Sequence, residues 1–207
     1  STLSVGREAK EMFGFIKKAR RVMHALIMLT IAQSVIFIFA VLAPGYVATI
    51  LEAPIESISW ILVAPAGLGL ALGAFMLGSI GKNFNRKKLS TIGFLVVGII
   101  FILLPFASRV SSHEFVKDLN NFLPHILIVN ILHIIVVLAF VIGFGISLVF
   151  IPSNATIQIE TKEAMRGRMY GLLSALIGAV SFLPVALAGG LADILGVGVV
   201  ITCVGVM

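Results

Sequence analysis

Charged residues are scarce in this chain of 207 residues. Asp, Glu, Lys and Arg make up 12% of it, roughly half the share of about 25% that is usual in soluble domains. Hydrophobic residues make up 59%, and the mean hydropathy is +1.15. So little polar surface cannot cover a water-soluble globule. The composition therefore excludes a soluble enzyme, a soluble nucleic-acid-binding domain and a disordered tail.

Cysteine and the common catalytic patterns are also lacking. A single cysteine, Cys203, excludes a disulfide within the chain and a metal site built from several cysteines. The sequence has no Gly-x-Ser-x-Gly, no His-Glu-x-x-His and no phosphate-binding loop. No carboxylate pair lies inside an apolar run. We therefore expect no enzyme, no metal site and no cofactor, which excludes an intramembrane protease and an ATP-driven pump.

Long apolar runs dominate what is present. A membrane helix needs about 20 apolar residues, and five runs meet this length, with a sixth beginning near residue 196. The five span residues 22–43, 57–80, 89–107, 126–151 and 168–192. The sequence thus predicts an all-α, polytopic membrane helix bundle over residues 22–207. Its sixth helix would extend only about 18 Å at 1.5 Å per residue, so we expect it to be truncated and the chain to be a fragment.

Basic residues alternate between the segments that connect these runs. Segments 1–21, 81–88 and 152–168 together contain 13 of the 15 Lys and Arg residues, and the remaining two are Arg109 and Lys117. This asymmetry predicts that the N-terminus is cytoplasmic in a multi-pass protein of the plasma or inner membrane. The same distribution argues against nucleic acid as a partner, because the cations are not gathered on one face with aromatic residues.

The first 21 residues combine cations with apolar residues at helical spacing. They are predicted to form a cytoplasmic amphipathic linker on the surface of the lipid bilayer. A solvated linker with incidental apolar residues is the alternative.

Two of the basic segments contain candidate gating residues. Residues 78–93 read GSIGKNFNRKKLSTIG, and residues 152–173 read PSNATIQIETKEAMRGRMYGLL. Their cations can interact with helix C-termini or with acidic groups of a neighbouring bundle, or they can simply anchor the topology. The candidates for conformational gating are Gly78, Arg86, Lys87, Lys88, Arg166, Gly167 and Arg168.

These segments resemble loops of the major facilitator superfamily, and more closely of its macrolide-efflux-like drug exporters. Gly78 and residues 86–88 are similar to the superfamily's cytoplasmic loop between helices eight and nine, although Lys82-Asn83 replaces an Asp-Arg pair. Pro152, Asn154, Gln158, Glu163 and residues 166–171 resemble the connection between helices ten and eleven. The resemblance implies that the chain is the C-terminal six-helix half of the fold, whose partner is an N-terminal six-helix half.

Polar side chains inside the apolar runs are few. Gln33 lies mid-run with Phe37 one turn away, and Asn130 and His133 are i, i+3 neighbours. In the superfamily, helices seven and ten line the central cavity, so the resemblance makes Gln33, Phe37, Asn130 and His133 candidates for contact with substrate. Interhelical hydrogen bonding is the alternative role for these side chains.

Small residues recur at helical spacing in three of the runs. They are Gly69, Gly73, Gly143, Gly171, Ser174 and Gly178. Such faces predict close approach between helix backbones.

The expected function is that of a secondary active transporter that exports a small amphipathic molecule by alternating access. A facilitator-type importer of a polar solute and a stand-alone structural protein of six helices are the alternatives. The apolar runs contain no internal Asp or Glu. If transport is coupled to protons, we expect the essential acid in the N-terminal half.

The charge asymmetry yields a test of topology. A cysteine introduced near Lys87 should not react with an impermeant thiol reagent added outside intact cells, whereas one near Ser112 should react. The measurement is labelling before and after permeabilisation. The reverse labelling pattern would contradict the predicted orientation.

Overall fold

A computed structural model describes residues 19–80, 85–106 and 131–206 of the chain. Every regular element in these residues is helical. The α-helices are α2 (Arg20–Thr49), α3 (Ala64–Ile80), α4 (Arg86–Leu103), α7 (Ile131–Glu160), α8 (Glu163–Leu195) and α9 (Val197–Val206). Short 3-10 helices at Ile55–Ser57 and Leu104–Phe106 and a π-helix at Ser59–Val63 extend α3 and α4 at one end of the bundle. The predicted all-α membrane bundle is confirmed.

Five of the helical segments are long and apolar enough to cross a membrane. They are Arg20–Thr49, Ile55–Ser79, Arg86–Phe106, Leu132–Glu160 and Glu163–Leu195. The sixth, α9, is apolar but shorter. All five predicted runs therefore correspond to helices, which extend past the apolar runs because the polar residues at their ends can continue a helix into the interface.

The apolar run that stops at residue 151 predicts a helix end near Pro152, and this prediction is wrong. Proline removes one backbone donor, yet α7 continues for two further turns to Glu160. Local side-chain bonds support this stretch: the Asn154 Nδ2 donates to the Phe150 carbonyl at 2.9 Å, and the Thr156 hydroxyl donates to the Pro152 carbonyl at 2.8 Å. The turn into α8 is then only Thr161 and Lys162, and Arg166 lies within the first turns of α8.

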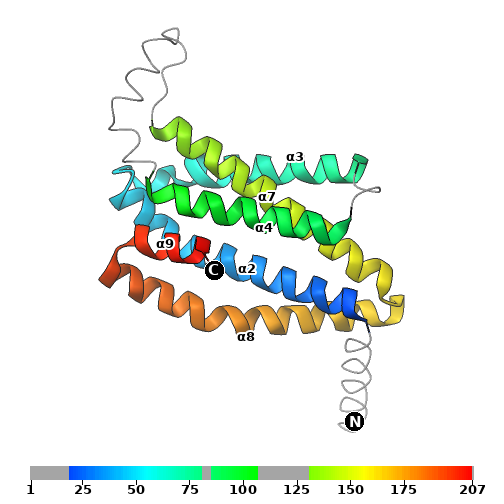
Figure 1. Cartoon of the computed structure of the whole chain (residues 1–207). Helices are drawn as coiled ribbons and strands as arrows, with labels where there is room; N and C mark the ends of the chain where they lie inside the picture. Colours follow the sequence, from blue (N-terminus) through cyan, green and yellow to red (C-terminus); the bar gives the residue numbers. More distant parts are fainter. Residues whose placement is uncertain (1–18, 81–84, 107–130, 207) are drawn as a thin grey trace.

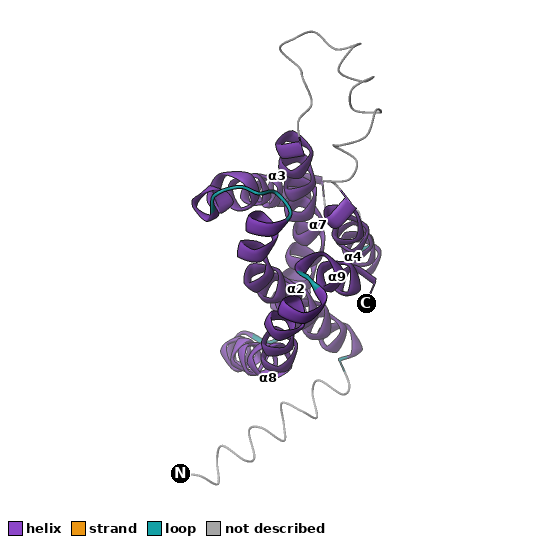
Figure 2. Ribbon diagram, turned by 90° about the vertical axis from the view of Figure 1, so that its left-hand side faces the viewer, coloured by secondary structure: helices purple, strands orange, loops and turns teal. Residues whose placement is uncertain are grey.

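The helices form two groups of three in chain order, α2–α3–α4 and α7–α8–α9 (Figures 1 and 2). The groups pack by exchange, which means that a helix of one group packs mainly on a helix of the other. The second helix of each group packs on the first helix of the other, so α3 lies against α7 and α8 lies against α2. The first helices, α2 and α7, contact each other, as do the third helices, α4 and α9. This arrangement leaves α3 and α8 at opposite edges of the bundle (Figure 2).

Close backbone contact joins α3 to α7. A methyl group at Gly69 would overlap the Phe140 carbonyl, one at Gly73 would overlap the Ser147 hydroxyl, and one at Gly143 would overlap the Ala66 carbonyl. The predicted close approach is confirmed at these three glycines. At Gly171 and Gly178 of α8 it is wrong, because a methyl group there would meet nothing within 4 Å.

The two ends of the bundle carry opposite charge in the described residues. One end, which we call the basic end, contains all eight described cations: Arg20, Arg21, Arg86, Lys87, Lys88, Lys162, Arg166 and Arg168. The opposite end, the acidic end, contains no described Lys or Arg but holds Glu52, Glu56 and Asp193. Gly196, with a φ of 87°, makes the tight turn from α8 into α9 at the acidic end.

A buried apolar core runs through the bundle toward both ends. Near the acidic end it includes residues of α2, α4, α7, α8 and α9, among them Tyr46 and Phe101. Near the basic end a second cluster joins Leu26 and Leu29 of α2 to Ile157 of α7 and Met169 of α8. The helices α4 and α9 contribute buried residues to the first cluster but not to the second.

The glycine contacts predict a matched pair of stability effects. Gly143→Ala should lower the thermal midpoint of the detergent-solubilised protein by about 5 °C, because forcing a methyl into a packed contact costs about 1–3 kcal/mol. Gly178→Ala is the control and should leave the midpoint unchanged or raise it, since alanine favours a helix and the site is open. Equal effects of the two substitutions would show that α3 and α7 are not in close contact.

Candidate functional site

The polar side chains of α2 lie at mid-depth in the bundle. The Ser34 hydroxyl donates to the Thr30 carbonyl at 2.8 Å, so it accepts the 2.7 Å hydrogen bond from the Ser181 hydroxyl of α8. Both serines are buried. The adjacent Gln33 is partly exposed, and its carboxamide forms no hydrogen bond with another described residue. Sequence reasoning proposed Gln33 for substrate contact, while the structural role in this region belongs to Ser34 and Ser181.

Gln33 and Phe37 share one side of α2 at i, i+4 spacing. The Phe37 ring is exposed, with 42% of its surface accessible. An amide and an aromatic ring are thus presented together on a surface of α2 that the described helices leave open. This pair suits an amphipathic ligand, because the ring offers apolar contact and the amide offers one donor and one acceptor.

His133 lies far from this pair along the bundle axis. Arg21 of α2 and Glu160 of α7 are paired at 3.0 Å, which places the basic ends of the two helices at one level. From that level, Gln33 is ~18 Å along α2 and His133 is ~40 Å along α7 at 1.5 Å per residue. His133 is exposed near the acidic end. Asn130 lies outside the described residues, so the structure does not place the predicted Asn130–His133 pair.

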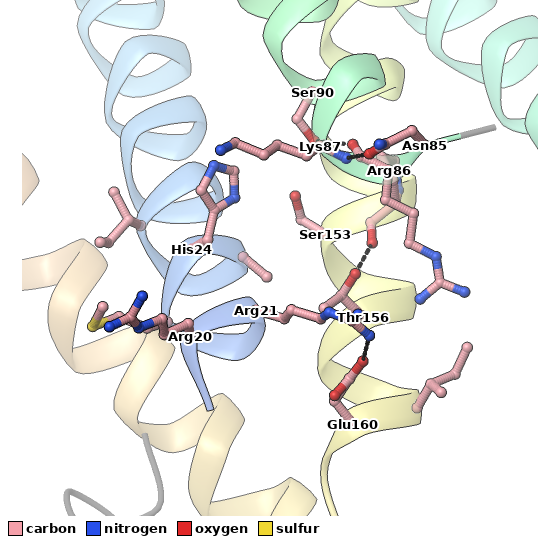
Figure 3. A pocket seen from close by; sticks show the side chains of 15 residues that line it. Arg20, Arg21, His24, Asn85, Arg86, Lys87, Ser90, Ser153, Thr156 and Glu160 are labelled. Atoms are coloured by element: carbon pink, nitrogen blue, oxygen red, sulfur yellow. Dashed lines mark hydrogen bonds and ion pairs between the residues drawn. The ribbon is translucent and has the colours of Figure 1, made fainter. Parts of the chain in front are cut away.

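A groove opens at the basic end between α2, α4 and α7 (Figure 3). Its volume is about 750 Å³. Arg20, Arg21 and His24 line it from α2, and Arg86 and Lys87 line it from the start of α4. Glu160, already paired with Arg21, is the carboxylate in the lining. The groove therefore has a cationic rim.

The Asn85 side chain fixes the start of α4 at this rim. Its Oδ1 accepts a hydrogen bond from the Lys87 backbone N–H at 3.1 Å, which caps the first turn. Of the predicted gating residues, Arg86 and Lys87 line the groove, and Lys88 is exposed beside them. Gly78 is exposed near the end of α3, with open space where a side chain would lie.

The second predicted gating segment lies at the start of α8. Arg166 is exposed and its Nε donates to the Thr161 carbonyl at 3.3 Å, which ties the first turns of α8 to the end of α7. Gly167 and Arg168 are exposed as well. The two gating segments thus share the basic end but lie on different helices.

Tyr170 forms a polar link between α7 and α8 that sequence reasoning did not identify. Its hydroxyl donates to the Asn154 Oδ1 at 3.1 Å and accepts from the Gln158 Nε2 at 3.4 Å. The i, i+4 spacing of Asn154 and Gln158 was the available signal, because it puts two amides on one face of α7. Their common partner, a residue of the next helix, could only be found in three dimensions.

Comparison with known proteins agrees with the helix arrangement. The family model of the Major Facilitator Superfamily matches residues 25–207, which is most of the chain. The chain belongs to this superfamily. No curated protein and no solved structure matches it significantly. Membership makes the chain part of a membrane transporter, and its exchanged groups of three helices agree with the three-plus-three inverted repeats within each half of such transporters.

Proposed function

We propose that this chain is the C-terminal half of a secondary transporter that exports a small amphipathic molecule, as in the macrolide-efflux-like branch of the superfamily. The observation that carries the proposal is the open surface with Gln33 and Phe37 at mid-depth, in a bundle whose described helices hold no charged side chain there. Such a surface favours a largely apolar substrate with few hydrogen-bonding groups.

An importer of polar solutes fits this surface less well. It would need several hydrogen-bonding side chains around the solute, whereas the described mid-depth polar groups near Gln33 bond to one another or to helix carbonyls. The facilitator-type alternative therefore receives less support. The stand-alone structural protein is disfavoured because the superfamily consists of transporters.

Alternating access is the mechanism that the proposal implies. Two six-helix halves rock about a central site, so that the site opens to one side of the membrane at a time. The N-terminal half would complete the cavity beside Gln33 and Phe37. Described carboxylates lie only toward the helix ends and in the connecting segments, so a coupling proton would be carried by an acid in the N-terminal half.

A transport assay tests the substrate class and the coupling together. The full-length transporter in proteoliposomes should accumulate erythromycin under an imposed proton gradient. Gln33→Leu should raise the KM about tenfold, because losing one hydrogen bond to substrate costs about 1–1.5 kcal/mol, whereas Ser79→Ala at an exposed position should not change it.

His133→Gln should keep the pH dependence of transport. Loss of proton-driven accumulation with intact exchange in His133→Gln would contradict the placement of coupling in the other half.

The basic segments supply the proposed gate. We propose that Arg166 and Arg168 form charge-assisted contacts with the other half when the basic ends of the two halves close together, and that these contacts break when that side opens. The exposure of both side chains supports this role.

Arg166→Ala should shift the full-length transporter toward the state that is open at the basic end. Crosslinking between cysteines placed at the basic ends of the two halves should fall relative to the same cysteine pair with Arg166 intact, and Lys162→Ala serves as the control. Unchanged crosslinking and unchanged transport would indicate that Arg166 serves only as a topology anchor.

A further inference from the structure

The turn between α7 and α8 buries a hydroxyl group that has no partner. Thr161 has 2% of its surface accessible, and its Oγ1 forms no hydrogen bond within the part of the chain that the structure describes. By contrast, the buried hydroxyl of Thr156 in the same region donates to the Pro152 carbonyl. Burying a hydroxyl without a partner destabilises the arrangement that buries it. An arrangement of the turn that gives Thr161 a partner would therefore gain stability.

The first turn of α8 lacks a side-chain cap. The residue in its N-cap position is Lys162, whose side chain makes no capping hydrogen bond. A lysine ammonium group has no acceptor, whereas the threonine hydroxyl accepts from the first N–H groups of a helix and caps it well. The residue immediately before Lys162 is Thr161. The side chain best suited to cap α8 thus lies one residue outside the position where a cap acts.

The Thr161 carbonyl can serve two alternative donors. As described, it accepts from the Arg166 Nε at 3.3 Å, while the Met165 N–H donates to the Lys162 carbonyl at 2.9 Å. In a helix capped by Thr161, the Thr161 carbonyl would accept from the Met165 N–H, and its hydroxyl would accept from another N–H of the first turn. The carbonyl would then point along the axis of α8. The Arg166 side chain would lose its partner at the turn.

A glycine makes the first turns of α8 easy to rearrange. A methyl group at Gly167 would meet nothing within 4 Å, so packing does not require a glycine there. Glycine is a poor helix former, and it weakens the helix at this point. Two positions further on, Met169 is fully buried in the cluster near the basic end. A rearrangement is therefore confined to the turn and to the residues of α8 before Met169.

We propose that the turn between α7 and α8 is a conformational switch with two arrangements. In the described one, Thr161 ends α7 and its carbonyl holds the Arg166 side chain. In the other, the ψ angle of Lys162 changes from 142° to a helical value of about −42°, Thr161 caps α8, and the Arg166 guanidinium is released. The switch itself does not depend on the substrate. Its effect on the gate rests on the proposed function, because the released Arg166 is then free to contact the other half.

Spin labelling tests the switch in the absence of substrate. The full-length protein in detergent, with its native cysteines replaced, including Cys203→Ser, carries a nitroxide on Ala164→Cys, an exposed position. Two arrangements of the turn should give a spectrum with two components. Thr161→Val keeps the shape of the side chain but cannot cap, so one component should fall about fivefold. Thr161→Asn, a stronger cap, should raise the same component.

Thr156→Val is the matched control for these variants. Its hydroxyl already has a partner in the Pro152 carbonyl, so its removal should leave the ratio of the two components unchanged. Thr161→Ser keeps a capping hydroxyl and should retain both components. A single component in the parent protein would overturn the proposal, because the turn would then have one arrangement. Equal ratios in Thr161→Val and Thr161→Asn would overturn it too, because the components would then reflect rotamers of the label.

Crosslinking at the basic ends tests the link between the switch and the gate. With the cysteine pair used for Arg166→Ala, Thr161→Val should lower the crosslinked fraction, and Thr161→Asn should raise it. Adding Thr161→Val to Arg166→Ala should have no further effect, because the switch acts through Arg166. Additive effects would overturn this link. A protein that shows these spectral and crosslinking changes but does not transport erythromycin would contradict the proposed substrate and support the switch.

Discussion

Close backbone contact between helices is the interaction on which this bundle depends. In a membrane, apolar side chains gain little by leaving lipid for protein, so helices associate through tight packing and a few hydrogen bonds. Gly69, Gly73 and Gly143 allow α3 and α7 to meet at their backbones, and Gly98 and Gly205 do the same for α4 and α9. The Ser34–Ser181 bond adds a polar contact between α2 and α8. These contacts fix the position of each helix relative to its neighbours.

Packing by exchange determines which surfaces remain open. Because α3 packs on α7 and α8 packs on α2, each group of three helices is stabilised by the other. The exposed apolar side chains of α8 include Phe182 and Leu183, and those of α3 include Phe75. Lipid and the other half of a transporter can both cover such surfaces. The open surface that presents Gln33 and Phe37 belongs to α2, which lies between α3 and α8 (Figure 2).

Separation of charge complements this packing. Cations of the described residues gather at the basic end and carboxylates other than Glu160 and Glu163 at the acidic end. The cations in the first turns of α2 and α4 oppose the dipoles of those helices, so helix stability does not explain their position. The positive-inside rule, under which cations gather at the cytoplasmic ends of membrane helices, accounts for such a distribution.

The sequence by itself determined the fold class, the five membrane-spanning segments and the charged ends, because hydropathy and the positions of Lys and Arg are local properties that add along a run. The family resemblance also followed from short segments, such as residues 166–171. Only the tertiary structure decided that Gly143 packs tightly while Gly178 does not, that α7 passes through Pro152, and that Gln33 and His133 lie at different depths. The partner of Tyr170 and the groove between α2, α4 and α7 were likewise visible only in the tertiary structure. These features depend on how two or three helices are placed relative to one another, and the pattern within one helix carries no information about the distance to its neighbours.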